Sequence, residues 1–343
     1  MQKNFPDLIT LAIETSCDDT SVAVLRGQKV LSNIVSSQYD GLKFGGIVPE
    51  LASRAHQANI IAVMDAALDQ AGISKKAIQL IGVTYGPGLI GSLLVGLNFA
   101  KGLSYSLGIP YVGVNHMEAH MLAAFLEEPN LDFPFISLIV SGGHTMLVLA
   151  EALGCYRILG ETQDDAAGEC FDKVARFLNI TTGEGSMMSG PVVDQRAQLG
   201  DPKKIKFPRP MGNSENLDFS FSGLKTSVLN YSKKQDNWSD LEINDICAGF
   251  QEAVVEVLVS KSLRACREQN ITTIVMSGGV AANSRLREEL RVQCDKSHVS
   301  LFIPSKPYCT DNAAMIGITA SLKYGNAQFS PLDLAPKPSL RLT

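Results

Sequence analysis

A chain of 343 residues, 45% of them hydrophobic, is long enough to form two domains with substantial cores. Its net charge of −5 does not indicate a nucleic-acid binder, although a local basic patch can exist within an acidic total. The seven cysteines are scattered without a Cys-x-x-Cys pair, which favours reduced thiols over a disulfide framework. No signal-peptide pattern precedes the first strand, and Lys101, glycines and Pro110 interrupt the long apolar run 89–114, so we expect a cytoplasmic protein without a membrane span.

The N-terminal part of the sequence alternates short apolar runs with stretches of helical periodicity. The apolar runs predict strands over residues 8–14, 20–26, 29–36, 80–85 and 111–114. Helical spacing predicts helices over residues 49–71 and 89–107. The first turn of the opening meander carries Glu14, Asp18 and Asp19, which either solvate the turn or hold a cation. Strands that alternate with helices favour an α/β domain with a mixed sheet.

Two of the five histidines, His116 and His120, lie four residues apart at the start of a further predicted helix. Positions i and i+4 share one helix face, so both imidazoles can point at one metal ion, with Asn115 as the N-cap. Zinc proteases with a helical His-Glu-x-x-His signature have the same histidine spacing. Here, however, Glu118 is turned about 200° from His116 around the helix axis and cannot serve as the general base of that family. Spacing alone leaves open the alternative of two partly exposed histidines on a surface helix, and a metal site requires a third ligand.

The second half of the sequence repeats the opening pattern. Strands predicted over 135–140, 145–151 and 156–160 form another meander about 127 residues after the first. Such a repeat predicts two related domains that face one another across a cleft. Residues 181–244 are irregular and predict an insertion with one or two helices. The remaining predicted elements are helices over 166–178, 242–269, 283–296 and 311–324, strands over 273–276 and 300–303, and a loosely packed tail over 331–343.

Two glycine turns follow predicted strands, Ser141-Gly142-Gly143-His144 and Ser277-Gly278-Gly279, the second leading to Asn283. Glycine lets backbone N–H groups approach a ligand closely, and the second turn precedes a helix N-terminus, where an anion is favoured. Two such turns at equivalent points of an α/β protein indicate a phosphate or nucleotide site.

Two aspartates have alternative interpretations. Asp172 either accepts hydrogen bonds from a ribose or a substrate amine, or forms a surface salt bridge with Lys173 or Arg176. Asp311 either caps the last helix or supplies the missing metal ligand. Two histidines and one carboxylate would leave coordination positions open for substrate.

Eight motifs in order resemble those of the bacterial TsaD family, the threonylcarbamoyl transferases of tRNA modification that were once labelled sialoglycoprotein endopeptidases. The matching stretches are Glu14–Asp18, Tyr85–Gly88, Asn115–His120, Val140–Thr145, Phe171–Lys173, Phe219–Thr226, Gly278–Val280 with Asn283, and Cys309–Asn312. The resemblance implies the α/β fold shared by actin, sugar kinases and heat-shock ATPases (ASKHA), duplicated in two domains with a nucleotide cleft between them. The expected domains are residues 1–132 with the returning tail 325–343, and residues 133–324 with the insertion at about 181–244.

The resemblance also implies the site residues. One divalent metal ion per subunit, Fe²⁺ in preference to Zn²⁺, is expected on His116, His120 and Asp311. The adenylated substrate is expected to contact Val140, Ser141, Gly142, Gly143, His144, Asp172, Gly190 and Asn283. The family's Pro-Gly-Gly-Pro turn is reduced here to Gly190-Pro191 after a few extra residues, and Ala313 replaces a usual glycine.

The activity implied is transfer of the threonylcarbamoyl group from threonylcarbamoyl-AMP to N6 of the adenosine at tRNA position 37, in tRNAs that read codons beginning with A. Glu14 or Asp18 would assist proton loss from the amine, and the choice between them stays open. The basic clusters proposed to hold tRNA are Lys203, Lys204, Lys206 and Arg209, or else Arg285, Arg287 and Arg291. Expected partners are a TsaB-like dimerising paralogue and a TsaE-like small ATPase. The competing hypotheses are a metalloprotease and a kinase or nucleotide sensor of the same fold.

Overall fold

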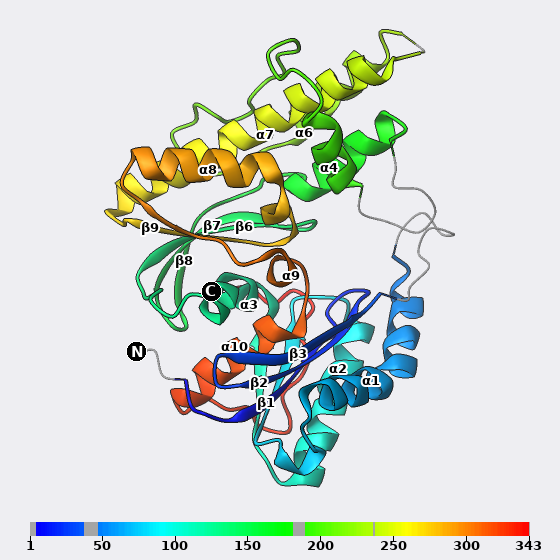
Figure 1. Cartoon of the computed structure of the whole chain (residues 1–343), viewed down its shortest axis with the longest axis vertical. Helices are drawn as coiled ribbons and strands as arrows, with labels where there is room; N and C mark the ends of the chain where they lie inside the picture. Colours follow the sequence, from blue (N-terminus) through cyan, green and yellow to red (C-terminus); the bar gives the residue numbers. More distant parts are fainter. Residues whose placement is uncertain (1–4, 38–46, 181–188, 236, 343) are drawn as a thin grey trace. The chain divides into compact units, whose positions relative to one another are not determined.

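The computed structural model describes residues 5–37, 47–180, 189–235 and 237–342 (Figure 1). The chain divides into two compact units: unit 1 is Met1–Phe133, Ala152–Cys155 and Pro304–Thr343, and unit 2 is Pro134–Glu151 and Tyr156–Ile303. Residues 304–324 thus cluster with unit 1, and the predicted domain bounds stay a prediction. Within the described ranges, no helix combines the length and apolar character that a membrane crossing requires.

Unit 1 is built on a five-stranded mixed sheet of order β3-β2-β1-β4-β5. The strands are β1 (Ile9–Glu14), β2 (Thr20–Arg26), β3 (Lys29–Ser36), β4 (Leu80–Gly86) and β5 (Tyr111–Asn115). Strands β1, β2 and β3 pair antiparallel as a meander, whereas β4 and β5 extend the sheet parallel to β1. The strands predicted from the sequence are confirmed to within about one residue, because buried apolar runs bounded by turn residues are a local signal.

Helices cover both faces of the sheet in unit 1. Helices α1 (Pro49–Ala71) and α2 (Ile90–Leu107) share a buried cluster with Leu11 and Ile13 of β1. Helix α10 (Ala313–Gly325) packs on the opposite face, where Gly317 leaves room for Ala12. Successive residues of a strand point to opposite faces, which accounts for this division along β1. The short elements of unit 1 are η2 (Lys75–Ala77), α3 (His116–Leu122), η3 (Ala123–Leu126) and α9 (Lys306–Cys309).

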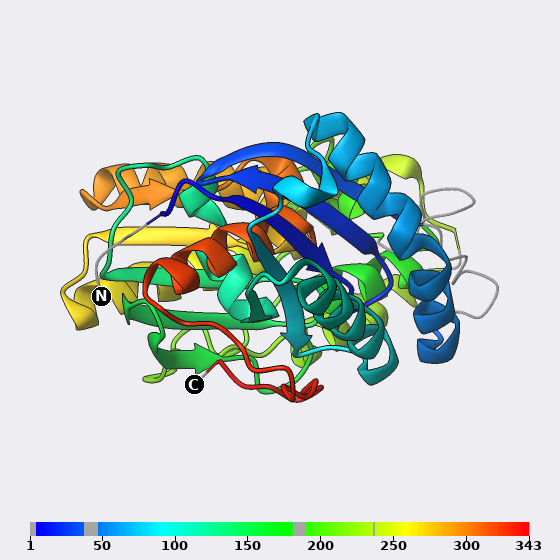
Figure 2. The same cartoon turned by 90° about the horizontal axis from the view of Figure 1, so that it is seen from below.

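The C-terminal tail forms no helix or strand over its described residues, and yet it is held firmly by unit 1 (Figure 2, red segment after α10). The Tyr111 hydroxyl donates to the Pro331 carbonyl at 2.5 Å, and the Lys101 ammonium donates to the Leu334 carbonyl at 2.5 Å. No residue of the described tail 331–342 is buried, in line with the predicted loose packing, while hydrogen bonds to the backbone anchor the tail. Its hydrogen bonds use mainly backbone atoms, which leave no periodic pattern in the sequence.

Unit 2 repeats the sheet of unit 1. Its strands β6 (Phe135–Val140), β7 (Thr145–Ala152), β8 (Cys155–Glu161), β9 (Thr273–Ser277) and β10 (Ser300–Phe302) have the order β10-β9-β6-β7-β8. Strands β6 and β7 pair antiparallel, and β9 and β10 extend the sheet parallel to β6. Counted within each unit, the strand order is the same, so the predicted duplication is confirmed.

The helices of unit 2 are α4 (Ala167–Phe177), α5 (Gly190–Ala197), α6 (Ser222–Ser232), α7 (Asp240–Gln269) and α8 (Ser284–Lys296), with the short 3₁₀ helix η4 (Gly279–Ala282) after β9. Helix α7 packs on β6 and β9 and begins with a capping box between Ser239 and Glu242. The irregular stretch 181–244, predicted to hold one or two helices, contains α5 and α6 among its described residues, which leave out 181–188 and 236.

Candidate metal centre and substrate-binding residues

Helix α3 brings the two histidines together directly after strand β5. The Asn115 side chain caps the helix, since its Oδ1 accepts from the backbone N–H groups of Met117 at 2.8 Å and Glu118 at 3.3 Å. The rings of His116 and His120 lie on one face, with centroids 4.7 Å apart. Both residues are buried, so the alternative of two exposed surface histidines is excluded.

Asp311 lies opposite the two histidines, in the loop that precedes α10. Its Oδ1 is 3.0 Å from Nε2 of His120 and 3.5 Å from Nε2 of His116. Asn312, not Asp311, caps α10, because its side chain accepts from the Met315 N–H at 3.1 Å. One ligand atom from each of His116, His120 and Asp311 lies within 4.8 Å of the others, so the three residues form a possible metal site.

The surroundings of these residues fit a divalent ion. Nδ1 of His116 lies 2.9 Å from Oε2 of the buried Glu14. Because a carboxylate can only accept, this bond places the proton on Nδ1 and leaves the Nε2 lone pair for a metal, as in carboxylate–histidine–metal sites. Two imidazoles and one carboxylate, without a thiolate, suit iron or zinc.

The buried charges reinforce this interpretation. Burial alone would lower the pKa of His116, but the carboxylates of Glu14 and Asp311 outweigh it and raise that pKa well above its ordinary value. Burial alone would raise the pKa values of both carboxyls, yet His116 holds the pKa of Glu14 below its ordinary value and that of Asp311 far below it. Two carboxylates thus require a neighbouring cation, either a proton on His116 or a metal ion.

Glu14, one of the two candidate general bases, is occupied by hydrogen bonds within the protein. Its carboxylate accepts from the Ser16 N–H at 2.5 Å and from the Thr84 hydroxyl at 2.6 Å, in addition to its bond with His116. The carboxyl ends of the parallel strands β1, β4 and β5 meet at one edge of the sheet, which brings Glu14, Thr84 and His116 together. A carboxylate with three partners and a lowered pKa is suited to orienting His116.

Glu118 lies on the other side of α3, as helical geometry predicts. Its carboxylate forms an ion pair with Lys323 of α10 at 2.7 Å, and the two side chains are only 4% and 18% exposed. Glu118 is therefore engaged away from the histidines, which argues against the protease hypothesis.

The first glycine turn of unit 2 has open space at its tip. The Ser141 N–H donates to the His144 carbonyl at 2.8 Å, and the Ser141 hydroxyl accepts from the His144 N–H at 3.1 Å. A Cβ added at Gly142 or Gly143 would meet no atom within 4 Å. The turn therefore leaves room for a ligand against its backbone.

The second glycine turn lies directly beside the first. Gly278 has φ +92°, and a Cβ there would lie 2.4 Å from the Val140 carbonyl oxygen, so only glycine fits. The turn leads through η4 to Asn283, which caps α8 by accepting from the Leu286 N–H at 2.9 Å and donates to Gln251 at 2.7 Å. Residues from both predicted turns thus meet at the carboxyl ends of β6 and β9.

Asp172 and Gly190 also come together. Oδ1 of Asp172 accepts from the backbone N–H groups of Ser189 at 2.7 Å and Gly190 at 2.9 Å, which stabilises the start of α5. Lys173 instead contacts Asp165 at 2.8 Å and Glu169 at 2.7 Å, so the alternative salt bridge between Asp172 and Lys173 is absent. Burial raises the pKa of the Asp172 carboxyl above its ordinary value.

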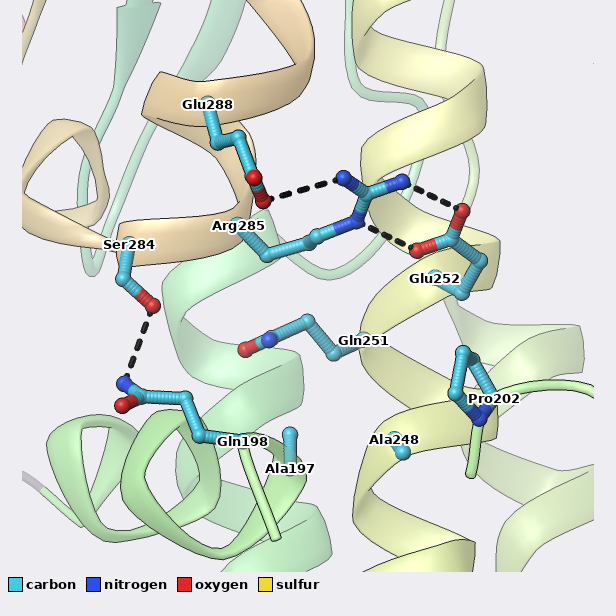
Figure 3. A pocket seen from close by; sticks show the side chains of 9 residues that line it. All are labelled: Ala197, Gln198, Pro202, Ala248, Gln251, Glu252, Ser284, Arg285 and Glu288. Carbon is cyan, nitrogen blue, oxygen red and sulfur yellow. Dashed lines mark hydrogen bonds and ion pairs between the residues drawn. The ribbon is translucent and has the colours of Figure 1, made fainter. Parts of the chain in front are cut away.

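A pocket of about 590 Å³ is lined in part by Gln251, which accepts a hydrogen bond from Asn283, and by Ser284, the next residue in the chain (Figure 3). Its lining combines apolar and polar side chains, and Arg285 forms ion pairs with Glu252 and Glu288 in its wall. The lining residues are Ala197, Gln198, Pro202, Ala248, Gln251, Glu252, Ser284, Arg285 and Glu288. Sequence reasoning did not identify Gln251, since it lies within a long helix whose local pattern is that of a core element.

Residues 29–318 match the TsaD family model, described as tRNA N6-adenosine threonylcarbamoyltransferase. The chain belongs to this family. It is 50% identical over 340 residues to the tRNA N6-adenosine threonylcarbamoyltransferase of Clostridium kluyveri, with 98% of each chain covered. It is 48% identical over 336 residues to that of Thermosipho africanus, covering 98% of this chain and 100% of the relative.

Solved structures with a similar fold are far more distant in sequence. HypF of T. kodakarensis has a TM-score of 0.65 at 15% identity, covering 94% of this chain and 49% of HypF. Component A of (R)-2-hydroxyglutaryl-CoA dehydratase from Acidaminococcus fermentans has a TM-score of 0.54 at 15% identity, covering 93% and 99%. These likenesses, together with the two equivalent mixed sheets, confirm the predicted ASKHA fold class.

Proposed function

We propose that this chain transfers the threonylcarbamoyl group of threonylcarbamoyl-AMP to N6 of the adenosine at position 37 of tRNAs that read codons beginning with A, and releases AMP. The observation that carries the proposal is the convergence of His116, His120 and Asp311 in a chain that belongs to this transferase family over nearly its whole length. Glu118 pairs with Lys323, so it is not placed to act as the general base of a protease.

We assign the threonylcarbamoyl end of the substrate to the metal centre. His116, His120 and Asp311 would hold a divalent ion, which would supply Lewis-acid polarisation of the substrate carbonyl oxygen. Glu14 keeps His116 in the tautomer that offers Nε2. The donor set suits Zn²⁺ as well as Fe²⁺, and the family resemblance favours Fe²⁺, one ion per subunit.

We assign the AMP end to the glycine turn that follows β6 and to Asn283. The open turn Ser141–His144, which follows Val140, offers its backbone to the phosphate, while Asn283 and the adjoining pocket take the adenosine. Asp172 uses Oδ1 for the N–H groups of Ser189 and Gly190. Its Oδ2 receives no hydrogen bond from another described residue and is assigned to a ribose hydroxyl.

The acceptor base needs no duplex opening, because an unpaired loop adenosine is already easy to splay out. We propose that the chain works in the cytoplasm with a TsaB-like dimerising paralogue and a TsaE-like small ATPase. The test is to incubate the purified chain, with and without these partners, with threonylcarbamoyl-AMP and unmodified tRNA. Nucleoside mass spectrometry is expected to show threonylcarbamoyl-adenosine and AMP in equal amounts. A phosphorylated acceptor would instead support a kinase, and a chelator-sensitive cleaved protein would support a protease.

Within the first basic cluster, we propose Lys203 and Lys206 as the residues that contact tRNA. Lys204 pairs with Asp245 at 2.8 Å and Arg209 pairs with Glu256 at 2.6 Å, whereas the exposed side chains of Lys203 and Lys206 form no ion pair with other described residues. The double variant Lys203→Glu, Lys206→Glu is therefore expected to bind tRNA about ten-fold more weakly at low salt. The slope of log affinity against log salt concentration is expected to fall by the equivalent of about two phosphate contacts.

The measurement is a filter-binding titration of tRNA at several salt concentrations. Arg291→Glu, a charge reversal in the alternative cluster, serves as the comparison. Unchanged affinity in the lysine variant, with weaker binding in the Arg291 variant, would move the tRNA contact to the second cluster.

A further inference from the structure

The tail residues 337–342 contact two motif stretches whose role the proposed function leaves unexplained, the turn Tyr85–Gly88 and the cap residue Asn115. Figure 2 shows this tail as the red segment that follows α10. Tail, turn and cap all belong to unit 1, as do the metal-binding residues.

The first contact runs through Asn115. While its Oδ1 caps α3, its Nδ2 donates to the Arg341 carbonyl at 2.9 Å. The same amide thus connects the end of the tail with the first turn of the helix that carries both histidines. Helix α3 has seven residues, a length that is not stable by itself, so its position depends on such contacts.

The second contact runs through the glycine turn. The Lys337 N–H donates to the Tyr85 carbonyl at 2.8 Å, and the Gly88 N–H donates to the Pro338 carbonyl at 3.1 Å. The approach is so close that a Cβ at Gly86 would lie 2.1 Å from the Lys337 carbonyl oxygen. Gly86 therefore lets the tail backbone pack directly against the turn, because a larger residue would collide with Lys337.

The other side of the same turn rests on Ser16. A Cβ at Gly88 would lie 2.4 Å from the Ser16 carbonyl oxygen, and the Leu89 N–H donates to that oxygen at 2.8 Å. The Ser16 hydroxyl lies 3.2 Å from Nδ1 of His116, and the Ser16 N–H donates to Glu14. The turn is thus packed between the tail and the residues that orient His116.

We propose that residues 337–342 position the metal centre. This tail segment holds α3 through Asn115, and it holds the turn at Ser16 through Gly86-Pro87-Gly88. This inference rests on the metal site of the proposed function. Metal ligands bind tightly only when their supporting residues fix their orientation, so loss of the tail loosens His116 without removing any ligand.

The experiment compares the full chain with a chain that ends at Pro336. The shortened chain keeps the anchors formed by Ser330, Pro331 and Leu334. Co²⁺ affinity is measured from the visible absorption of the bound ion, and hydrogen exchange is measured at the Met117 and Glu118 amides. The shortened chain is expected to bind Co²⁺ about ten-fold more weakly and to exchange these amides about ten-fold faster.

Two variants separate the tail contact from other effects. Asn115→Ser keeps a capping hydroxyl but is too short to reach the Arg341 carbonyl, so it is expected to weaken Co²⁺ binding in the full chain and to add nothing in the shortened chain. Arg341→Ala is the control, because the contact uses the backbone oxygen, and it is expected to bind Co²⁺ normally.

Co²⁺ affinity and exchange within two-fold of the full chain, in a folded shortened chain, would overturn the proposal. If the shortened chain does not fold, Asn115→Ser in the full chain decides by the same two readouts. If the full chain itself binds no Co²⁺, the proposed metal centre fails, and hydrogen exchange alone decides whether the tail positions α3.

Discussion

Cells whose only copy carries His116→Ala with His120→Ala are expected to contain almost no threonylcarbamoyl-adenosine in their tRNA. The two substitutions remove both nitrogen donors of the proposed metal site and leave Asp311 alone, which cannot retain a divalent ion. Loss of the polarising ion removes several kcal/mol of transition-state stabilisation, or at least about 10³-fold in rate. The measurement is nucleoside mass spectrometry of tRNA after the wild-type copy is switched off.

The control for this experiment is His298→Ala, since His298 is exposed on unit 2 and lies among none of the site residues described above. The tRNA of cells that carry His298→Ala is expected to be fully modified. Buried histidines also contribute to packing, so circular dichroism must show that the double variant is folded. Full modification by a folded double variant would exclude the metal-dependent mechanism while leaving the family membership unaffected.

Glu14→Gln is expected to have the second-largest effect, a 10- to 100-fold loss of metal affinity at high pH. The buried amide can still accept from the Ser16 N–H through its oxygen, but its NH₂ group then takes the place of the oxygen that contacts both His116 and the Thr84 hydroxyl, which must turn to accept. It then presents its NH₂ group to Nδ1 of His116, which must accept and so carries its proton on Nε2. In this tautomer Nε2 of His116, the atom that faces Asp311, carries a proton and cannot bind a metal ion.

The pH dependence of metal binding is also expected to change in this variant. Metal binding requires neutral His116, and the carboxylates of Glu14 and Asp311 raise the pKa of His116 above its ordinary value although burial opposes them. In the wild-type chain, affinity therefore rises with pH until the pH exceeds this raised pKa. Without the Glu14 charge the pKa of His116 falls, so the rise in affinity is expected to occur at lower pH.

Both effects are measured by Co²⁺ titration between pH 5 and pH 9. Glu118→Gln is the matched control, because it removes a buried carboxylate of the same short helix that pairs with Lys323 instead of facing the histidines. Its pH profile is expected to match the wild-type profile even if its stability is lower. A Glu14→Gln profile identical to the wild type in both plateau and midpoint would contradict the orienting role of Glu14.

The sequence determined the local features of this protein. Helical spacing placed His116 and His120 on one face, and the Asn115 cap and the opposite orientation of Glu118 followed from the same geometry. The strands and the repeated meander were equally readable, because each depends on a short run of neighbouring residues. For Asp311 the local pattern left two alternatives open, a helix cap or a metal ligand, and the family resemblance favoured the ligand.

Only the tertiary structure decided which distant residues meet. Glu14 contacts His116 across 102 residues of sequence, and Asn115 contacts Arg341 across 226. Likewise, no local pattern distinguishes Asp311 as a cap from Asp311 beside His120, 191 residues away. The order of strands β1, β4 and β5 in the sheet brings their carboxyl ends together. Side-chain and backbone bonds formed at that edge depend on this order, whereas sequence periodicity reports only which face of its own element a residue occupies.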